Sequence, residues 1–145
     1  MDLKNKRILA VDYGRKVTGL ASFHVAHDPF PTAYDRVIYS SDEQLTEEIA
    51  RIVDQELIDI LVIGVPYFTD GGESRLTKEI KAFASQLEQK LSIQVFQEDE
   101  TLTTFEAEQR MKNDPRYNFQ IDLKKIDELC AVIILEQFYK NSQKI

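Results

Sequence analysis

Short apolar runs alternate with helical patterns along this chain, and together they predict an α/β protein. Three apolar runs come first, at residues 7–12, 18–25 and 35–40, separated by a turn and a proline-containing loop. Short links between successive strands favour an antiparallel meander. Two further runs, at 58–66 and 93–96, each follow a segment with apolar residues at helical spacing. Strands joined through helices pair in parallel, so we expect a mixed sheet of five strands flanked by helices.

Amphipathic segments lie between and after the later apolar runs, and they predict the helices. The spacing of a capping box, in which two side chains bond the first helical turn, occurs twice: at Ser41 with Gln44 and at Thr103 with Glu106. Asp122 is placed to cap the last helix. The predicted order is therefore β-β-β-α-β-α-β-α-α. No repeat, low-complexity tract or linker interrupts it, so we expect all 145 residues to form a single domain.

The composition is that of a globular protein without a membrane segment. Hydrophobic residues make up 43% and charged residues 30% of the chain, and no apolar run approaches the roughly 20 residues of a membrane helix. No signal-peptide core precedes the first strand. Cys130 is the only cysteine, which excludes an intrachain disulfide and a cysteine-rich zinc site. These features predict a cytoplasmic protein.

The net charge of −7 argues against a non-specific binder of polyanions, because affinity for phosphate usually comes from basic surface. Local basic groups are nevertheless present, and an acidic cluster that binds cations would itself lower the total. The basic residues fall in three groups: Lys4, Lys6, Arg7, Arg15 and Lys16; Arg110, Lys112 and Arg116; Lys124 and Lys125.

Acidic residues follow the first and the last predicted strand. Asp12 ends the first strand, while Glu98, Asp99 and Glu100 end the last one, and Asp127 lies on the final helix. Sites in open α/β sheets form beyond the carboxyl ends of the parallel strands, so these acids are expected at one edge. Converging carboxylates repel one another, and a hard dication such as Mg²⁺ relieves that repulsion. Two such ions roughly 3.5–4 Å apart stabilise both oxygens of a phosphodiester displacement.

Each acid also has a purely structural explanation. Asp12 could be a turn residue, and Asp127 could pair with Lys124 at the surface. The acids at 98–100 could form a solvated turn that complements the dipole of the next helix. Their joint placement in one architecture favours the metal site, but the pattern alone does not say which of the three acids at 98–100 is the ligand.

Other candidate residues have simpler interpretations. His24 and His27 are separated by three positions, which on a strand points them to opposite faces and argues against shared metal binding. Cys130 is expected to be a small core residue with a protonated thiol. The glycines at 64–66 and 70–72 either approach a phosphate backbone or form a turn and a loop tip.

Four blocks of this sequence resemble the YqgF/RuvX family, whose members are described as Holliday junction resolvases and as pre-16S rRNA nucleases. The resemblance runs from about residue 8 to residue 138. The family pattern D-Y-G-x-K-R-I-G reads D-Y-G-R-K-V-T-G here, and D-E-R-L-[ST]-T reads D-E-T-L-T-T. The blocks are VDYGRKVTGLA (11–21), IGVPYFTDGGES (63–74), EDETLTT (98–104) and KKIDELCAVIIL (124–135).

The resemblance implies an RNase H-like fold and a metal-binding triad of Asp12, Glu100 and Asp127 holding Mg²⁺ or Mn²⁺, with two ions expected. It also implies that the first block, 11–21, contacts phosphate and that the third block, 98–104, helps to position the backbone of the substrate. The substrate-contacting residues are then Gly14, Arg15, Lys16, Thr103 and Thr104.

The implied activity is endonucleolytic hydrolysis of structured nucleic acid. RNA is favoured, with processing of the 5′ end of pre-16S rRNA as the role and pre-ribosomal particles as partners. Branched DNA, cut by a Holliday junction resolvase, is the alternative. No membrane partner is expected, and the protein would act as a monomer or a homodimer.

Two departures from the family pattern keep other functions open. Thr101 stands where the family has arginine, and Val17-Thr18 replace an Arg-Ile pair. Arginine is a natural phosphate ligand, so its loss also fits a non-catalytic nucleic-acid or ribosome-associated module. A third possibility is an actin-like phosphotransferase, but that architecture normally needs two such domains.

Overall fold

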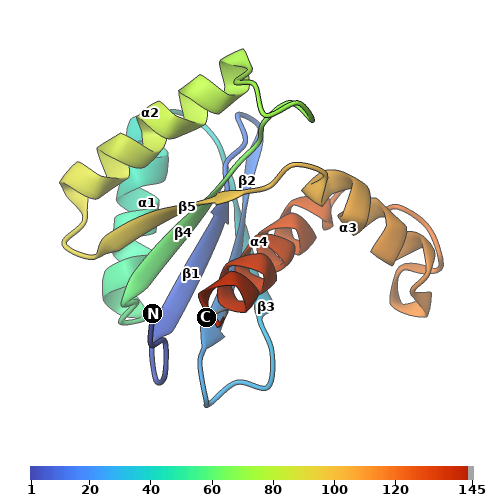
Figure 1. Cartoon of the computed structure of the whole chain (residues 1–145), viewed down its shortest axis with the longest axis horizontal. Helices are drawn as coiled ribbons and strands as arrows, with labels where there is room; N and C mark the ends of the chain where they lie inside the picture. Colours follow the sequence, from blue (N-terminus) through green and yellow to red (C-terminus); the bar gives the residue numbers. More distant parts are fainter. Residues whose placement is uncertain (144–145) are drawn as a thin grey trace.

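The computed structural model describes residues 1–143 and contains a five-stranded mixed sheet (Figure 1). The strand order is β3-β2-β1-β4-β5. β1 pairs antiparallel with β2, and β2 with β3, whereas β4 pairs in parallel with both β1 and β5. The predicted meander with two added parallel strands is thus confirmed. The strands are β1 (Arg7–Asp12), β2 (Val17–His24), β3 (Thr32–Ile38), β4 (Ile60–Val65) and β5 (Gln94–Asp99).

Helices cover both faces of this sheet (Figure 1). Helices α1 (Asp42–Gln55) and α2 (Arg75–Lys90) lie on one face, and α4 (Ile126–Ser142) lies on the other. Helix α3 (Thr103–Lys112) and the short 3₁₀ helix η1 (Pro115–Tyr117) extend from the end of β5, and α3 packs against α4. Among the described residues, none of the helices has the length and apolar character needed to cross a membrane.

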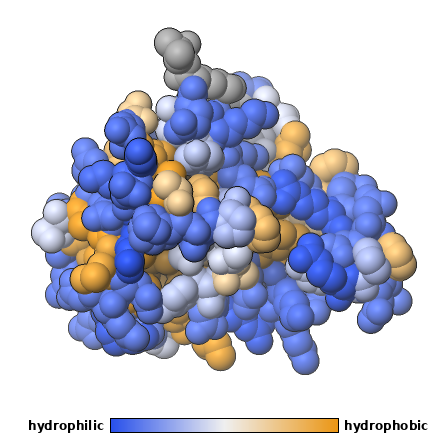
Figure 2. Space-filling model, turned by 90° about the horizontal axis from the view of Figure 1, so that it is seen from below, coloured by the Kyte–Doolittle hydropathy of each residue, from blue (hydrophilic) through white to orange (hydrophobic). Residues whose placement is uncertain are grey.

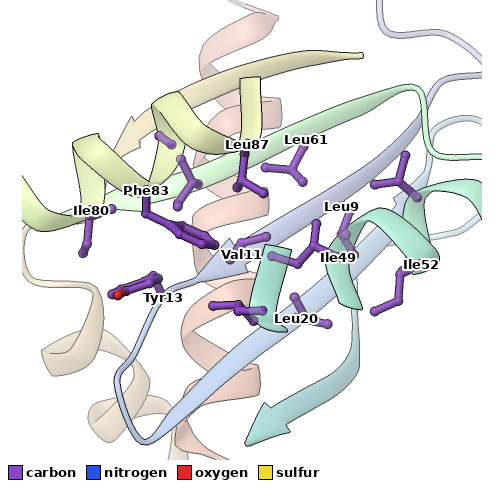
Figure 3. Packing of buried hydrophobic residues seen from close by; sticks show 14 of the residues in the cluster. Leu9, Val11, Tyr13, Leu20, Ile49, Ile52, Leu61, Ile80, Phe83 and Leu87 are labelled. Atoms are coloured by element: carbon purple, nitrogen blue, oxygen red, sulfur yellow. The ribbon is translucent and has the colours of Figure 1, made fainter. Parts of the chain in front are cut away.

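The alternation of side chains along β1 separates two hydrophobic cores. Leu9 and Val11 pack against α1 and α2, in one cluster with Phe83 of α2 (Figure 3). Ile8 and Ala10 face the other way and pack against α4. Successive strand residues point to opposite faces, so Asp12 continues the row that faces α4. The acid that ends β1 therefore points toward the final helix.

The surface seen from below is mostly hydrophilic, with apolar side chains in separate patches (Figure 2). The exposed large apolar residues come from different parts of the chain, which fits such scattering. They include Phe30, Ile38, Phe68, Leu102, Phe105 and Leu123.

Two strands differ from the sequence prediction by three residues at one end, while the other ends agree within two residues. β3 begins at Thr32, inside the predicted loop, and ends at Ile38. β5 runs on to Asp99, three residues past the predicted end at Phe96. Parallel pairing with β4 reaches Asp99, which pairs with Val65. The strand continues through these polar residues because its backbone still pairs with β4, and tertiary pairing of this kind outweighs the low strand propensity of polar side chains.

The predicted helix starts are partly wrong. Ser41 caps α1, accepting a hydrogen bond from the Gln44 amide at 3.0 Å, but the Gln44 side-chain oxygen has no hydrogen-bond partner among the described residues, so only half of the predicted capping box forms. Thr103 does not cap α3: the cap is Leu102, in the left-handed region at φ 70°, with no side-chain hydrogen bond. Asp122 accepts from the Lys124 amide at 2.9 Å, and so bonds the turn before α4 rather than the helix itself.

The two histidines lie on the same side, contrary to the sequence prediction. β2 ends at His24, and Ala26 adopts a left-handed conformation at φ 73°. The turn brings His27 back over His24, with ring centroids 3.9 Å apart. The prediction assumed that side chains alternate between the two faces of a strand as far as His27, but the strand ends at His24.

Candidate functional site

Asp12 lies between two glycines on the face of the sheet that α4 covers. Asp12 pairs with Gly19 of β2, and directly opposed residues of antiparallel strands point to the same face. A Cβ atom on Gly19 would lie 2.0 Å from the Asp127 carbonyl oxygen. The backbone at the start of α4 therefore rests directly on β2. The missing side chain of Gly19 allows Asp127 to lie beside the strand that carries Asp12.

Gly64 lies on β4, the neighbour of β1 on the side opposite β2, and its missing side chain also leaves room for an acidic residue. A Cβ atom there would lie 2.9 Å from Glu100 Cδ and 2.4 Å from Ile134 Cδ1. The Glu100 carboxyl group thus occupies the space above Gly64. β4 separates β1 from β5, so this space is the route by which Glu100 reaches Asp12.

The Asp12 and Glu100 side chains lie close enough to share a hydrogen bond when one of the two carboxyl groups is protonated. Burial raises the pKa of Glu100 well above its ordinary value, and the neighbouring Asp12 charge raises it further. Burial also raises the pKa of Asp12, with a smaller increase from the charge of Asp127, although its hydrogen bond to Glu100 acts in the opposite direction. Such a pair cannot hold two full charges unaided, so it either shares a proton or binds a cation.

The three acids that follow Phe96 have different partners. Glu98 Oε2 accepts a hydrogen bond from Asn141 Nδ2 of α4 at 2.9 Å. Asp99 Oδ1 accepts from the Thr101 amide at 2.8 Å and so closes the turn after β5. The Glu100 amide donates to the Val65 carbonyl at 3.0 Å. Only Glu100 among these three reaches Asp12, a distinction that the sequence pattern left open.

The turn after Glu100 buries one threonine and exposes the next. The Thr103 amide donates to the Glu100 carbonyl at 2.9 Å. The Thr103 hydroxyl is buried and has no hydrogen-bond partner among the described residues. Thr104 is exposed at the surface, with its hydroxyl 4.0 Å from Cys130 Sγ. Of the two threonines, Thr104 is therefore the one that a substrate backbone can reach.

Asp127 is on the same face but does not complete a closed triad. Burial raises its pKa, and the positive charge of Arg36 opposes that rise. Within residues 1–143, no three His, Cys, Asp or Glu side chains are grouped closely enough to hold a metal ion together. The structure therefore brings Asp12 and Glu100 into contact and leaves Asp127 nearby. Magnesium commonly takes one or two protein carboxylates, with waters and substrate phosphates as further ligands, and the Asp12–Glu100 pair fits that donor set.

The turn between β1 and β2 presents Arg15 and Lys16 at the surface beside Asp12. Gly14 keeps this turn tight, because a Cβ atom there would lie 2.3 Å from the Val17 carbonyl oxygen. Arg15 Nη2 is 3.2 Å from Glu79 Oε1, an exposed ion pair. Lys16 is exposed, and its carbonyl oxygen accepts from the Tyr39 amide at 2.9 Å. Both cations can thus meet a phosphate that approaches the end of β1.

Several residues around the site were not found from the sequence. Asp42 Oδ1 accepts hydrogen bonds from the Tyr13 hydroxyl at 2.7 Å and the Tyr39 hydroxyl at 2.8 Å, which fixes the turn that carries Lys16. Arg36 contacts the segment before α4. These contacts join positions far apart in the chain, and no local motif marks them. Cys130 is buried, and burial raises the pKa of its thiol, as expected for a core residue.

A family model named RuvX, with the description Holliday junction resolvase, matches residues 6–141. A relative from Haemophilus ducreyi named "Putative pre-16S rRNA nuclease" is 31% identical over 137 residues, covering 93% of this chain and 96% of the relative. A protein of the same name from Shewanella oneidensis is 29% identical over 138 residues, covering 94% of this chain and 95% of its own length.

Solved structures show the same fold at low sequence identity. Thermus thermophilus RuvC has a TM-score of 0.60 at 8% identity and covers 94% of this chain and 96% of its own. The fowlpox virus resolvase, solved with Holliday junction DNA, has a TM-score of 0.60 at 13% identity, covering 95% of this chain and 99% of its own. The five-stranded mixed sheet with its flanking helices is thus an RNase H-like fold.

Proposed function

Because this chain belongs to the RuvX family of Holliday junction resolvases, we propose that it is a divalent-metal-dependent endonuclease acting on structured nucleic acid. The observation that carries this proposal is the contact between Asp12 and Glu100. Burial raises the pKa values of both carboxyl groups at the carboxyl end of the parallel strands, and the charge of Asp12 raises that of Glu100 further. Acids whose pKa is strongly perturbed by burial and by a specific charged neighbour are candidates for a functional site.

The residues divide into ligands and substrate contacts. Asp12 and Glu100 would hold Mg²⁺ or Mn²⁺, with Asp127 as the third ligand. Two bound ions would supply Lewis acidity toward the phosphodiester oxygens. Lys16 and Arg15 would neutralise and orient the phosphate from the turn next to Asp12.

The remaining substrate contacts would come from short backbone segments. Gly14 keeps the β1–β2 turn compact, and Thr104 offers an exposed hydroxyl to the nucleic-acid backbone. Thr103 supports the turn after Glu100 from a buried position. The Thr101 hydroxyl lies 3.4 Å from the Tyr67 carbonyl oxygen. Threonine carries no positive charge, so phosphate binding would depend on Arg15 and Lys16.

RNA is the proposed substrate, with the 5′ end of pre-16S rRNA as the target in cytoplasmic pre-ribosomal particles. The names of the full-length relatives from Haemophilus ducreyi and Shewanella oneidensis support this assignment. Branched DNA is the second candidate, and the description of the matching family favours it. The protein could act on either as a monomer or a homodimer.

Cleavage assays on both substrates test the proposal. A precursor rRNA fragment and a synthetic four-way DNA junction are incubated with purified protein in Mg²⁺, in Mn²⁺ and with chelator. We expect metal-dependent cleavage of the RNA that Asp12→Asn abolishes. Asp54→Asn, which changes an exposed acid on α1, should cut like the wild type.

The outcomes separate the candidate functions. Cleavage of the junction in preference to RNA would assign the protein to branched DNA. Tight binding of either substrate without turnover in any metal would indicate a non-catalytic module. Full activity of Asp12→Asn would overturn the metal mechanism.

A further inference from the structure

Arg36 lies on the edge strand β3, and its side chain reaches the segment that precedes α4. In the register of the sheet, Arg36 pairs with Gly19, and Gly19 pairs with Asp12. Opposed residues of antiparallel strands share a face, so Arg36 and Asp12 flank Gly19 on the α4 side. Arg36 Nη1 donates a hydrogen bond to the Lys124 carbonyl oxygen at 2.8 Å. A residue 88 positions earlier thus contacts the segment just before the final helix.

The start of α4 fills the space between these two side chains. A Cβ atom on Gly19 would lie 2.0 Å from the Asp127 carbonyl oxygen and 2.9 Å from the Glu128 amide nitrogen. Helix α4 begins after Lys125, which provides no side-chain cap. The position of its first turn therefore depends on contacts from outside the helix, among them the close contact with Gly19 and the hydrogen bond from Arg36.

We propose that Arg36 is a positioning residue that holds the first turn of α4 on β2 and so places the Asp127 carboxylate beside Asp12. This inference rests on the proposed function, because it takes Asp127 as a metal ligand. Residues that hydrogen-bond to a metal ligand itself typically change metal affinity 10- to 100-fold when they are removed, and Arg36 acts one step further away, through the Lys124 carbonyl, so we expect the lower end of that range. The charge of Arg36 acts in the opposite direction, since a guanidinium near the site repels a divalent cation.

These opposing effects make Arg36→Ala a decisive variant. If Arg36 positions Asp127, its removal weakens Mn²⁺ binding about 10-fold. If Arg36 acts only through its charge, removal strengthens binding. Arg36→Lys keeps a donor and the charge, so it should recover most of the lost affinity. Arg51→Ala removes an arginine that pairs with Glu48 on α1, and it should bind Mn²⁺ like the wild type.

Electron paramagnetic resonance of free Mn²⁺ gives the affinities without any need for turnover. The set of variants is completed by Asp127→Asn and by the double variant with Arg36→Ala. Because Arg36 acts through Asp127, the double variant should bind no more weakly than Asp127→Asn alone, which is the mark of coupled residues. Hydrogen exchange of the metal-free protein should be faster at amides 124–128 in Arg36→Ala, while Arg51→Ala should leave those amides unchanged.

The failure of this inference differs from the failure of the proposed function. Unchanged or tighter Mn²⁺ binding by Arg36→Ala, with weaker binding by Asp127→Asn, would overturn the role of Arg36 and leave the metal site intact. Additive losses in the double variant would also overturn it. Absence of Mn²⁺ binding by the wild type, or no effect of Asp127→Asn, would overturn the assignment of Asp127 as a ligand and the role of Arg36 with it.

Discussion

The Asp12 and Glu100 carboxyl groups contact each other across Gly64, which lies on the strand between β1 and β5. A side chain at that position would occupy the place of the Glu100 carboxyl group. The contact brings two partly buried acids together, which destabilises the fold when both are ionised. The same two acids attract a divalent cation. They therefore both destabilise the metal-free protein and give it the capacity to bind metal.

This pair should make the stability of the metal-free protein depend on pH. Burial raises both carboxyl pKa values in the folded state. The folded protein then binds more protons than the unfolded chain, so the free energy of unfolding falls as the pH rises from about 4 through neutral pH. We expect urea unfolding in the presence of chelator to give lower stability at about pH 8 than at about pH 6.

Two variants and one ligand check the origin of this pH dependence. Asp12→Asn removes one charge of the pair, so its stability should fall less over the same pH range. Asp54→Asn should keep the wild-type slope, because that side chain is exposed on α1. Saturating Mg²⁺ should restore stability at the higher pH. A slope in Asp12→Asn equal to that of the wild type would show that other groups are responsible.

Gly64→Ala should disable the site. The added methyl group would lie 2.4 Å from Ile134 Cδ1 and 2.9 Å from Glu100 Cδ, so the side chains of Ile134 and Glu100 must both shift. Overpacking of this kind typically costs about 1–3 kcal/mol of stability. We also expect weaker Mn²⁺ binding, measured by electron paramagnetic resonance, because Glu100 loses its place beside Asp12.

Gly72→Ala is the matched control for this substitution. Its nearest neighbour would be Asp70 Oδ1 at 3.0 Å, the end of an exposed side chain that accepts a hydrogen bond from the Gly72 amide and can move outward at the cost of that one exposed bond. It should unfold at nearly the wild-type denaturant concentration and bind Mn²⁺ normally. If Gly64→Ala also retained wild-type affinity, the space above Gly64 would have no role in placing Glu100.

The order of the strands and helices was predictable because it depends on local periodicity. The apolar run that forms β1 indicated a strand buried on both faces, and the structure confirms it with separate cores on either side. The edge on which Asp12 and the acids at 98–100 meet followed from the parallel connections. These features need only the sequence pattern and the handedness rules of α/β folds.

The choice among the three acids could not be derived in this way. It depends on where β5 ends and on the absence of a side chain at Gly64, and neither is visible in the local pattern. The resemblance to the family had singled out Glu100. The cap at Leu102 was missed because a left-handed leucine is unusual, and Arg36 was missed because its contact with Lys124 spans most of the chain.

Thr101→Arg should strengthen nucleic-acid binding. Thr101 stands where the family pattern has arginine, and it lies partly exposed directly after Glu100. An added guanidinium there can reach a phosphate, so we expect tighter binding and a slope of log affinity against log salt that steepens by about 1. Fluorescence anisotropy with labelled RNA at several salt concentrations measures both quantities.

Thr101→Val separates the added charge from the lost hydroxyl. The threonine hydroxyl donates a hydrogen bond to Asp99 Oδ1 and lies 3.4 Å from the amide nitrogen and the carbonyl oxygen of Tyr67, and both substitutions remove these contacts. The valine variant should show the wild-type salt slope. Equal affinity and slope in all three proteins would mean that a cation at this position does not meet the substrate.

Asp42→Ala should loosen the turn that carries Arg15 and Lys16. Asp42 accepts hydrogen bonds from the hydroxyls of Tyr13 and Tyr39, and Tyr13 is buried against α2. Loss of the acceptor leaves two tyrosine hydroxyls without their partner, which typically costs about 1–3 kcal/mol when the groups are buried. We expect lower stability in urea and a higher KM for nucleic acid.

Glu43→Ala provides the control on the same helical turn. Glu43 is the next acid in the first turn of α1, exposed and equally placed to complement the helix dipole. Loss of that effect alone costs only about 0.3–1 kcal/mol. A KM that rises in Asp42→Ala and stays at the wild-type value in Glu43→Ala would place the tyrosine contacts, rather than the helix dipole, in control of the turn. Equal effects of the two substitutions would contradict that role, because only Asp42 contacts Tyr13 and Tyr39.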